Sequence, residues 1–137
     1  MSHSRVRNLL ATKLAEYATT KGIRVSYENY KLYPNVDETY LETCTLPAPT
    51  ITRTLSGDHK EFLGVYQIKI IVGSGVATAL SDQIVEELQT AFPVDSTYVD
   101  VSGFTVQVIS PVSIAQGKVQ DGKWVIPCSL EYRADTF

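Results

Sequence analysis

The chain has 137 residues, 44% of them hydrophobic and 20% charged, which is typical of one globular domain. Twelve basic residues against fifteen acidic ones give a formal net charge of −3. This balance argues against sequence-independent nucleic-acid binding, which needs clustered Lys and Arg to displace counterions from phosphates. No apolar run approaches the length of a membrane span, and the N-terminus lacks the apolar core of a signal peptide. We therefore expect a single cytoplasmic domain over residues 1–137.

The cysteines and histidines form no redox or metal-binding motif. Cys44 and Cys128 lie far apart and outside any CxxC pair, and His3 and His59 are not spaced for zinc. Both cysteines fall in strand-like segments, where a free thiol usually packs as a small hydrophobic group. We expect no disulfide, no metal and no cofactor.

The first predicted element is a helix over residues 5–21. Apolar residues recur there at helical spacing, and Ser4 and Gly22 suit its N-cap and its left-handed C′ position. The basic residues of this segment are too sparse to form a patch. We expect them on the solvated face of the helix: Arg5, Arg7 and Lys13.

Several β segments follow the helix. Residues 23–27 alternate apolar and polar side chains, and residues 40–46 form a second strand, ended by Pro47-Ala48-Pro49. Two prolines so close together end the strand because neither can donate to a sheet ladder. Residues 50–55 are a further β-rich run, and residues 56–61 form a polar loop tip.

The strongest strand prediction covers residues 63–72. Its even-numbered apolar residues share one face, whereas Gln67 and Lys69 point to the other. Ile71 breaks this alternation, so we expect the sheet to be covered on both faces there. Gly73-Ser74-Gly75 then turns into a second amphipathic helix, which Pro93 ends.

The final third is also β-rich. Phe104, Val106 and Val108 alternate with polar residues, and residues 124–132 place alternate apolar side chains on one face. Pro127 lies within the latter segment and indicates an edge strand or a bulge.

Together these segments predict an α+β fold in the order α-β-β-β-α-β-β. A single mainly antiparallel, mixed sheet with both helices packed on one face would bury both apolar helix stripes.

No catalytic motif accompanies this ordered framework. His59 beside Asp58 could suggest acid–base chemistry, but such a pair in a polar loop is usually solvated. Gly73-Ser74-Gly75 before a helix could bind an anion, yet it lacks the further glycines and the Lys-Ser/Thr of a phosphate loop. We predict that the protein is not an enzyme and has no catalytic residue.

The order of several landmarks points to a known family. The N-terminal helix precedes Tyr27-Glu28-Asn29, Tyr40-Leu41-Glu42 and Leu46-Pro47-Ala48, and Gly64-Val65-Tyr66-Gln67-Ile68 leads to the helix ending at Phe92-Pro93. Over about residues 5–93 this series resembles the tail terminator-like proteins of long-tailed, non-contractile phages and prophages, which are similar in fold to the lambda tail terminator. Many relatives have Trp or Phe where this chain has Tyr27 and Tyr30.

The resemblance implies a structural protein of the virion, made in the host cytoplasm and located at the head-proximal end of the tail. It implies a hexameric ring on the tail tube that stops tube polymerisation and presents a surface for head joining. The implied partners are further copies of the chain, the major tail tube protein and the head–tail connector protein. DNA would pass through the ring without specific binding, and no membrane would be involved.

A closed ring needs a head-to-tail interface between two different surfaces of the subunit. The loop from Ile51 to Glu61 is the best candidate because it carries both charge signs, although a solvated hairpin tip has the same composition. The candidate subunit or tail contacts are Arg53, Asp58, His59, Lys60 and Glu61.

Two other classes of function stay open at this point. Another head–tail joining or neck component of the virion would share the small α+β fold. A small cytoplasmic ligand-binding domain, or an enzyme, would need a concave apolar pocket, lined for instance by Tyr66 or Trp124.

Overall fold

Two long antiparallel strands, β3 (Lys60–Gly73) and β8 (Lys123–Thr136), form the centre of the sheet. They pair without interruption from Lys60 opposite Thr136 to Gly73 opposite Lys123. The structure is a computed structural model that describes residues 2–27, 38–52, 55, 57, 60–73, 78–120 and 122–136.

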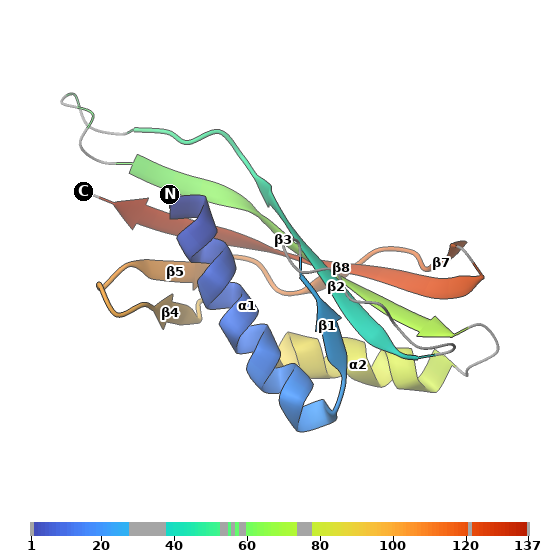
Figure 1. Cartoon of the computed structure of the whole chain (residues 1–137). Helices are drawn as coiled ribbons and strands as arrows, with labels where there is room; N and C mark the ends of the chain where they lie inside the picture. The colour runs from blue at the N-terminus through green and yellow to red at the C-terminus, as the bar shows by residue number, and fades with distance from the viewer. Residues whose placement is uncertain are drawn as a thin grey trace.

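The remaining elements are arranged around this pair (Figure 1). In chain order they are α1 (Ser2–Lys21), β1 (Arg24–Ser26), β2 (Tyr40–Pro47), α2 (Thr78–Ala91), β4 (Thr97–Val99), β5 (Thr105–Val108), β6 (Ser113–Ile114) and β7 (Lys118–Gln120).

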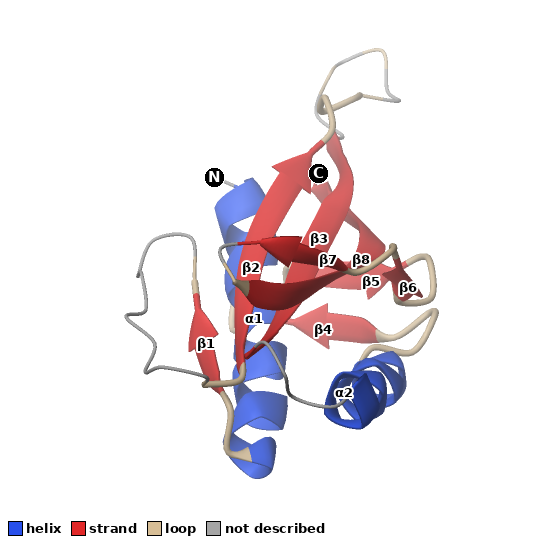
Figure 2. Ribbon diagram, turned by 90° about the vertical axis from the view of Figure 1, so that its right-hand side faces the viewer, coloured by secondary structure: helices blue, strands red, loops and turns tan. Residues whose placement is uncertain are grey.

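The sheet is mixed and curled, with the strand order β1-β2-β3-β8-β5-β4 (Figure 2). β1 runs parallel to β2, and the other pairings are antiparallel, including those of β6 and β7 with β8. Both helices lie on one side of the long β3–β8 pair. The predicted α+β class with two helices on one face of a mainly antiparallel sheet is confirmed.

The core lies between the helices and the inner face of the sheet. Alternate side chains of β3 and β8 meet apolar side chains from α1 and α2, and each fully buried aliphatic group contributes roughly 1.5–3 kcal/mol. The buried set includes Val6, Leu10, Leu14, Tyr66, Ile68, Ile70, Ile84, Leu88, Phe92, Cys128, Leu130 and Tyr132.

The outer face of the sheet is also closed at one end. Ile71 points away from the helices and is paired with Val125 of β8, and both side chains are buried. The prediction that the sheet is covered on both faces at Ile71 is therefore confirmed.

α1 ends as its sequence predicts. Gly22 has a φ of 76°, the Ile23 N–H donates to the Ala18 carbonyl at 2.9 Å, and the Gly22 N–H donates to the Thr19 carbonyl at 3.3 Å. These two bonds form a Schellman C-cap. At the other end the helix begins at Ser2, so Ser4 lies inside it and is not the N-cap.

Pro127 confirms one of the two alternatives that the sequence predicts. β8 has neighbours on both sides, so the predicted edge strand is wrong, and the register with β3 is regular through Pro127. On the other side, residues 115–117 face only residues 126 and 127 of β8, which is the arrangement of a β-bulge. The Pro127 carbonyl accepts a hydrogen bond from the Ala115 N–H at 2.9 Å. The nitrogen and the carbonyl of a strand residue point to the same side of the strand. The Pro127 nitrogen, which carries no N–H to donate, therefore faces the gap between β6 and β7.

Neither helix combines the length and the apolarity needed to cross a membrane, within the part of the chain described. Neither Cys44 nor Cys128 forms a disulfide, and burial raises the pKa of Cys128 to about 11.

Candidate assembly surface

The loop predicted as an interface begins at an irregular end of the β2–β3 hairpin. Pro47 pairs with Gly64, but the next pairing is an isolated bridge between Ile51 and Glu61. Residues 48–50 therefore face only two residues of β3, which is the arrangement of a β-bulge. This end of the hairpin lies beside both chain termini in Figure 1. The β-rich run predicted over residues 50–55 is reduced to the bridge at Ile51 among the described residues.

The five candidate contact residues fall in different settings. Arg53, Asp58 and His59 lie outside the described residues. Lys60 is exposed and begins β3, so this strand starts three residues earlier than predicted. Glu61 is the second residue of β3 and is only 2% exposed. The structure thus places Lys60 at the surface and Glu61 in the sheet.

Arg133 balances the buried charge of Glu61. Glu61 and Asp135 are opposite each other across β3 and β8, and like charges in such a pair repel. The Arg133 guanidinium lies between them, with Nη2 3.3 Å from Glu61 and Nε 3.2 Å from Asp135. Glu61 therefore anchors the root of the loop within its own chain.

The N-terminus of α1 packs against the same root. His3 Nδ1 lies 2.9 Å from the Tyr132 hydroxyl, and the His3 ring meets the Phe62 ring edge-on at 5.2 Å between centroids. Burial lowers the pKa of His3, which favours the neutral ring. Gly64 makes room for this contact, because a Cβ there would lie 2.4 Å from the Tyr132 hydroxyl.

These contacts hold the hairpin in place and assemble no catalytic set among the described residues. His3 hydrogen-bonds to the hydroxyl of a buried tyrosine and packs against a phenylalanine ring, which are contacts of a structural histidine. The described residues contain no group of three or more His, Cys, Asp or Glu side chains that could hold a metal ion. The root of the β2–β3 hairpin end is therefore fixed to α1 and β8.

The sequence of the chain matches a known protein family. The family model described as phage tail terminator protein matches residues 5–132. The chain belongs to the phage tail terminator protein family. The match continues into the β-rich final third, beyond the residues 5–93 that carry the resemblance in the sequence. This family is structural, so the chain acts in tail completion as a component of the virion tail.

A solved structure supports the same assignment of the fold. It superposes with a TM-score of 0.83 and 29% sequence identity, covering 100% of this terminator and 98% of the solved chain. No curated protein matches at a significant level.

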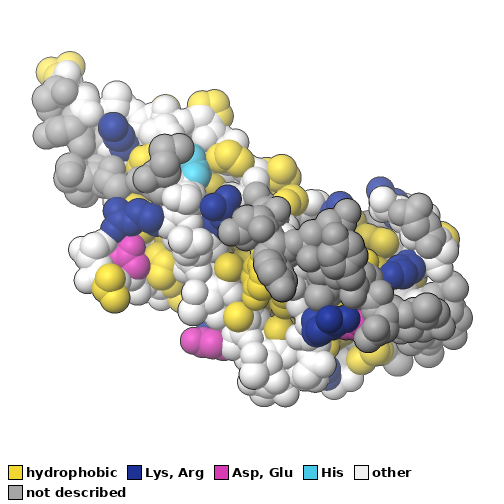
Figure 3. All heavy atoms as spheres, in the orientation of Figure 1, with side chains coloured by type: hydrophobic (Ala, Val, Ile, Leu, Met, Phe, Trp, Pro, Cys, Tyr) yellow, Lys and Arg dark blue, Asp and Glu magenta, His cyan; other side chains and the backbone are white. Residues whose placement is uncertain are grey.

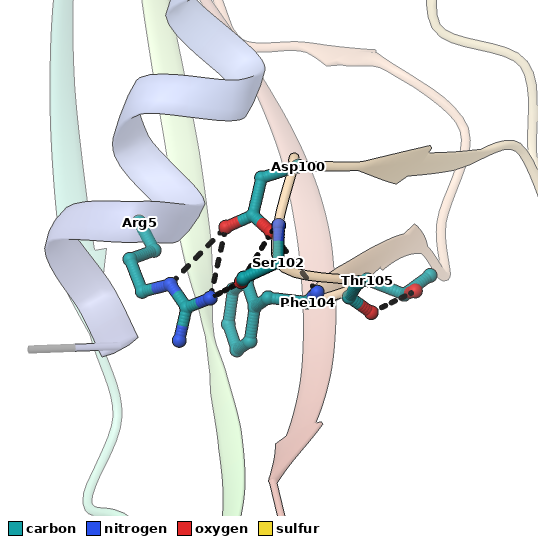
Figure 4. Close-up of polar contacts among 6 residues, drawn as sticks. Arg5, Asp100, Ser102, Phe104 and Thr105 are labelled. Carbon is teal, nitrogen blue, oxygen red and sulfur yellow. Dashed lines mark hydrogen bonds and ion pairs between the residues drawn. The ribbon is translucent and has the colours of Figure 1, made fainter.

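The turn between β4 and β5 is also fixed to the rest of the fold (Figure 4). One oxygen of Asp100, Oδ1, accepts hydrogen bonds from the Ser102 N–H at 2.9 Å, the Ser102 hydroxyl at 2.6 Å and the Phe104 N–H at 3.0 Å. Gly103 follows with a φ of 88°, a backbone conformation that favours glycine.

Arg5 ties this turn to the first helix. Its Nη2 lies 3.0 Å from Asp100 Oδ2, it also donates to Ser102 Oγ, and its guanidinium carbon sits 4.5 Å above the Phe104 ring centre. Hydrogen bonds lower the pKa of Asp100 to about 2, with the Ser102 hydroxyl as the largest cause. The sequence predicts Arg5 on a solvated helix face, but in the structure Arg5 joins α1 to the β4–β5 turn. The Asp-Val-Ser-Gly sequence at 100–103 is the signal that could have indicated the turn.

A groove of about 550 Å³ separates the C-terminal halves of the two terminator helices. Tyr17 donates to Glu87 Oε2 at 2.7 Å, and Lys21 Nζ lies 2.9 Å from Glu87 Oε1. These bonds lower the pKa of Glu87, and burial, with the bond to Glu87, raises the pKa of Tyr17. Tyr17, Lys21 and Glu87 are therefore hydrogen-bonded or ion-paired with one another.

The molecular surface in Figure 3 shows the apolar side chains as separate groups among polar and charged ones on the face that it presents. Single exposed apolar side chains of this kind are normal on a protein surface.

Proposed function

We propose that this tail terminator forms a closed ring, of six subunits, on the head-proximal end of the completed tail tube. The ring blocks further addition of the major tail tube protein and offers a surface to the head–tail connector protein. The observation that carries this proposal is the family match over residues 5–132. The protein acts by docking and catalyses no reaction.

The anchored β2–β3 hairpin end supports this role. A closed ring needs a surface that meets a different surface on the next subunit. The loop beyond Ile51 carries Arg53, Asp58, His59 and Lys60, and we propose these residues as contacts with the neighbouring subunit or the tube. Glu61, neutralised by Arg133, keeps the root of that loop in position. Fixing the root lowers the ordering cost of binding.

The net charge of the subunit suits a ring through which DNA passes without specific binding. A net charge of −3 and the lack of clustered basic residues in the sequence give phosphates little to bind. DNA leaving the head passes through such a ring with weak contacts. The ring assembles in the host cytoplasm and remains at the head-proximal end of the tail.

Sedimentation of the purified protein over a wide concentration range, alone and with tail tube protein, tests the ring. We expect one closed oligomer, with six subunits by native mass spectrometry, to form alone or on the tube. A strictly monomeric protein under all of these conditions would contradict the proposal. Electron microscopy of capped tubes then shows at which end the oligomer lies.

A further inference from the structure

The exposed face of α2 carries charge of one sign. The helix contains no Lys or Arg, and Asp82 and Glu86 are both exposed, four positions apart. Side chains at this spacing are neighbours on a helix, and two like charges there repel each other. Neither carboxylate forms an ion pair within the part of the chain that the structure describes. Glu87, by contrast, is paired with Lys21. The subunit thus leaves two adjacent negative charges on α2 unbalanced.

Basic side chains gather on the outer face of the sheet, where β8 begins. Lys118 of β7 is opposite Val125 of β8, which is in turn opposite Ile71 of β3. Residues directly opposite each other in antiparallel strands lie on the same face, so Lys118 shares the outer face with Ile71. Lys69 and Lys123 line a hollow of about 180 Å³ on this face, together with Ile71 and Val125. The three lysines therefore form one surface.

This lysine surface carries an excess of positive charge. Glu42 also lines the hollow and is opposite Lys69 across β2 and β3. Three lysines against one glutamate leave two positive charges among the described residues, and Asp121 of the β7–β8 turn lies outside them. Lys69 and Lys118 form no ion pair with any part of the subunit that the structure describes. The excess equals in size the charge of the two carboxylates on α2.

The acidic face of α2 and the lysine surface lie on opposite sides of the sheet. α2 packs on the inner side, with Ile84 and Leu88 in the core, whereas the lysines lie on the outer side (Figure 1). The two surfaces therefore cannot meet within one subunit. A polyanion such as DNA would match the lysines but would leave α2 unbalanced. A second copy of the chain balances both surfaces, in the head-to-tail contact that a ring needs.

We infer that α2 of one subunit docks through Asp82 and Glu86 on the outer sheet face of the next subunit, against Lys69, Lys118 and Lys123. This inference rests on the proposed ring and names one of its subunit interfaces. Each subunit uses the helix side of its sheet for one neighbour and the outer side for the other neighbour. Complementary charge then fixes which surfaces meet and suppresses contacts between like surfaces.

Reversing the charge of each surface tests the inference. The helix variant is Asp82→Lys with Glu86→Lys, and the sheet variant is Lys118→Glu with Lys123→Glu. Each variant alone brings like charges together at every contact, so its self-association should weaken at least about tenfold in sedimentation. An equimolar mixture of the two variants should assemble again, because alternating subunits restore opposite charges at every contact. Such an alternating ring requires an even number of subunits, as in the proposed hexamer.

Glu131→Lys is the control for a change of charge on the sheet. Glu131 is exposed on the same strand as Lys123, eight residues further along. At about 3.3 Å per residue it lies roughly 26 Å from Lys123, so this variant should associate like the wild type. All variants should keep the wild-type melting temperature within a few degrees, because the substituted side chains are not buried.

The outcomes separate this interface from the ring itself. If the wild type assembles and either variant alone assembles equally well, or if the mixture does not recover, the inference is overturned and the ring stands. Variants that self-associate normally but fail to cap tail tubes would assign these charges to the tube, which also overturns it. If the wild type never assembles, alone or on tubes, the ring fails and the inference with it. Loss of assembly in each variant, with recovery in the mixture, supports both.

Discussion

Arg5 and Asp100 are 95 positions apart in the chain, yet their side chains form an ion pair at 3.0 Å that joins α1 to the β4–β5 turn. The same carboxylate accepts three hydrogen bonds inside the turn. The turn is thus joined to α1 by this ion pair, together with the contacts of Arg5 to Ser102 and Phe104.

Asp100 should therefore make stability depend on acid pH. Its pKa falls from 3.8 to about 2 in the folded protein, so its contribution is fully present above about pH 4. It is lost as the pH drops through about 2, where the folded state also becomes protonated. We expect Asp100→Asn to lower the melting temperature at pH 6 and to approach the wild type as the pH falls toward 2.

Thermal unfolding between about pH 6 and pH 2 measures this difference. Arg5→Met serves as the comparison, because it removes the ion pair but keeps the three hydrogen bonds of the turn. It should show a smaller effect of the same sign. A difference between Asp100→Asn and the wild type that does not change with pH would contradict the role of the carboxylate.

Leu88 tests the packing of α2 on the sheet. Its side chain is fully buried in the shared core. Leu88→Ala should reduce the free energy of unfolding by about 2–5 kcal/mol, measured by urea denaturation. Glu86→Ala, at an exposed site of the same helix, should change it by less than about 0.5 kcal/mol. Equal effects of the two substitutions on the free energy of unfolding would mean that the buried side chains of α2 do not hold the helix to the core.

Gly64 tests the packing between β3 and the buried Tyr132. An added Cβ would lie 2.4 Å from the Tyr132 hydroxyl and 2.8 Å from the Leu46 carbonyl oxygen, which belongs to the backbone. We expect Gly64→Ala to destabilise the fold by about 1–3 kcal/mol, because the backbone atom cannot move freely. Chemical denaturation measures the loss. If Gly64→Ala left the free energy of unfolding unchanged, β2 and Tyr132 would have to move apart at this point.

Lys60 and Glu61 are adjacent in sequence but should behave differently. Lys60 is exposed, so reversing the charge of Arg53 and Lys60 together should block assembly or tail completion with little change in melting temperature. Glu61→Gln should instead destabilise the subunit by about 1–3 kcal/mol, because it weakens the buried contact with Arg133. Calorimetry and a tail completion assay separate the two effects. Normal virions from the Arg53 and Lys60 variant would remove the loop from the interface.

The sequence predicts the parts of this fold that depend on local pattern. The alternation in residues 63–72 identifies the inner face of β3, and Gly22 marks the end of α1, because period and turn chemistry are readable along the chain. The second amphipathic helix is likewise predicted, and Ile84 and Leu88 of α2 are buried in the core.

Features that depend on distant neighbours are not predicted. The edge-strand alternative for Pro127 is wrong, because β8 gains neighbours on both sides only when β3 and the later strands pair with it. Arg5 meets Asp100, and Glu61 meets Arg133, only after the sheet has formed. The sequence marks the segment before β3 as charged, but the division into exposed Lys60 and buried Glu61 requires the strand register.

Electron microscopy of tails assembled without this protein shows whether it ends tube growth. Without it we expect tail tubes of uncontrolled length that carry no heads, and uniform, head-joined tails should return when the wild-type protein is supplied. Tails of normal length, joined to heads in its absence, would contradict the claim that this chain ends tube growth.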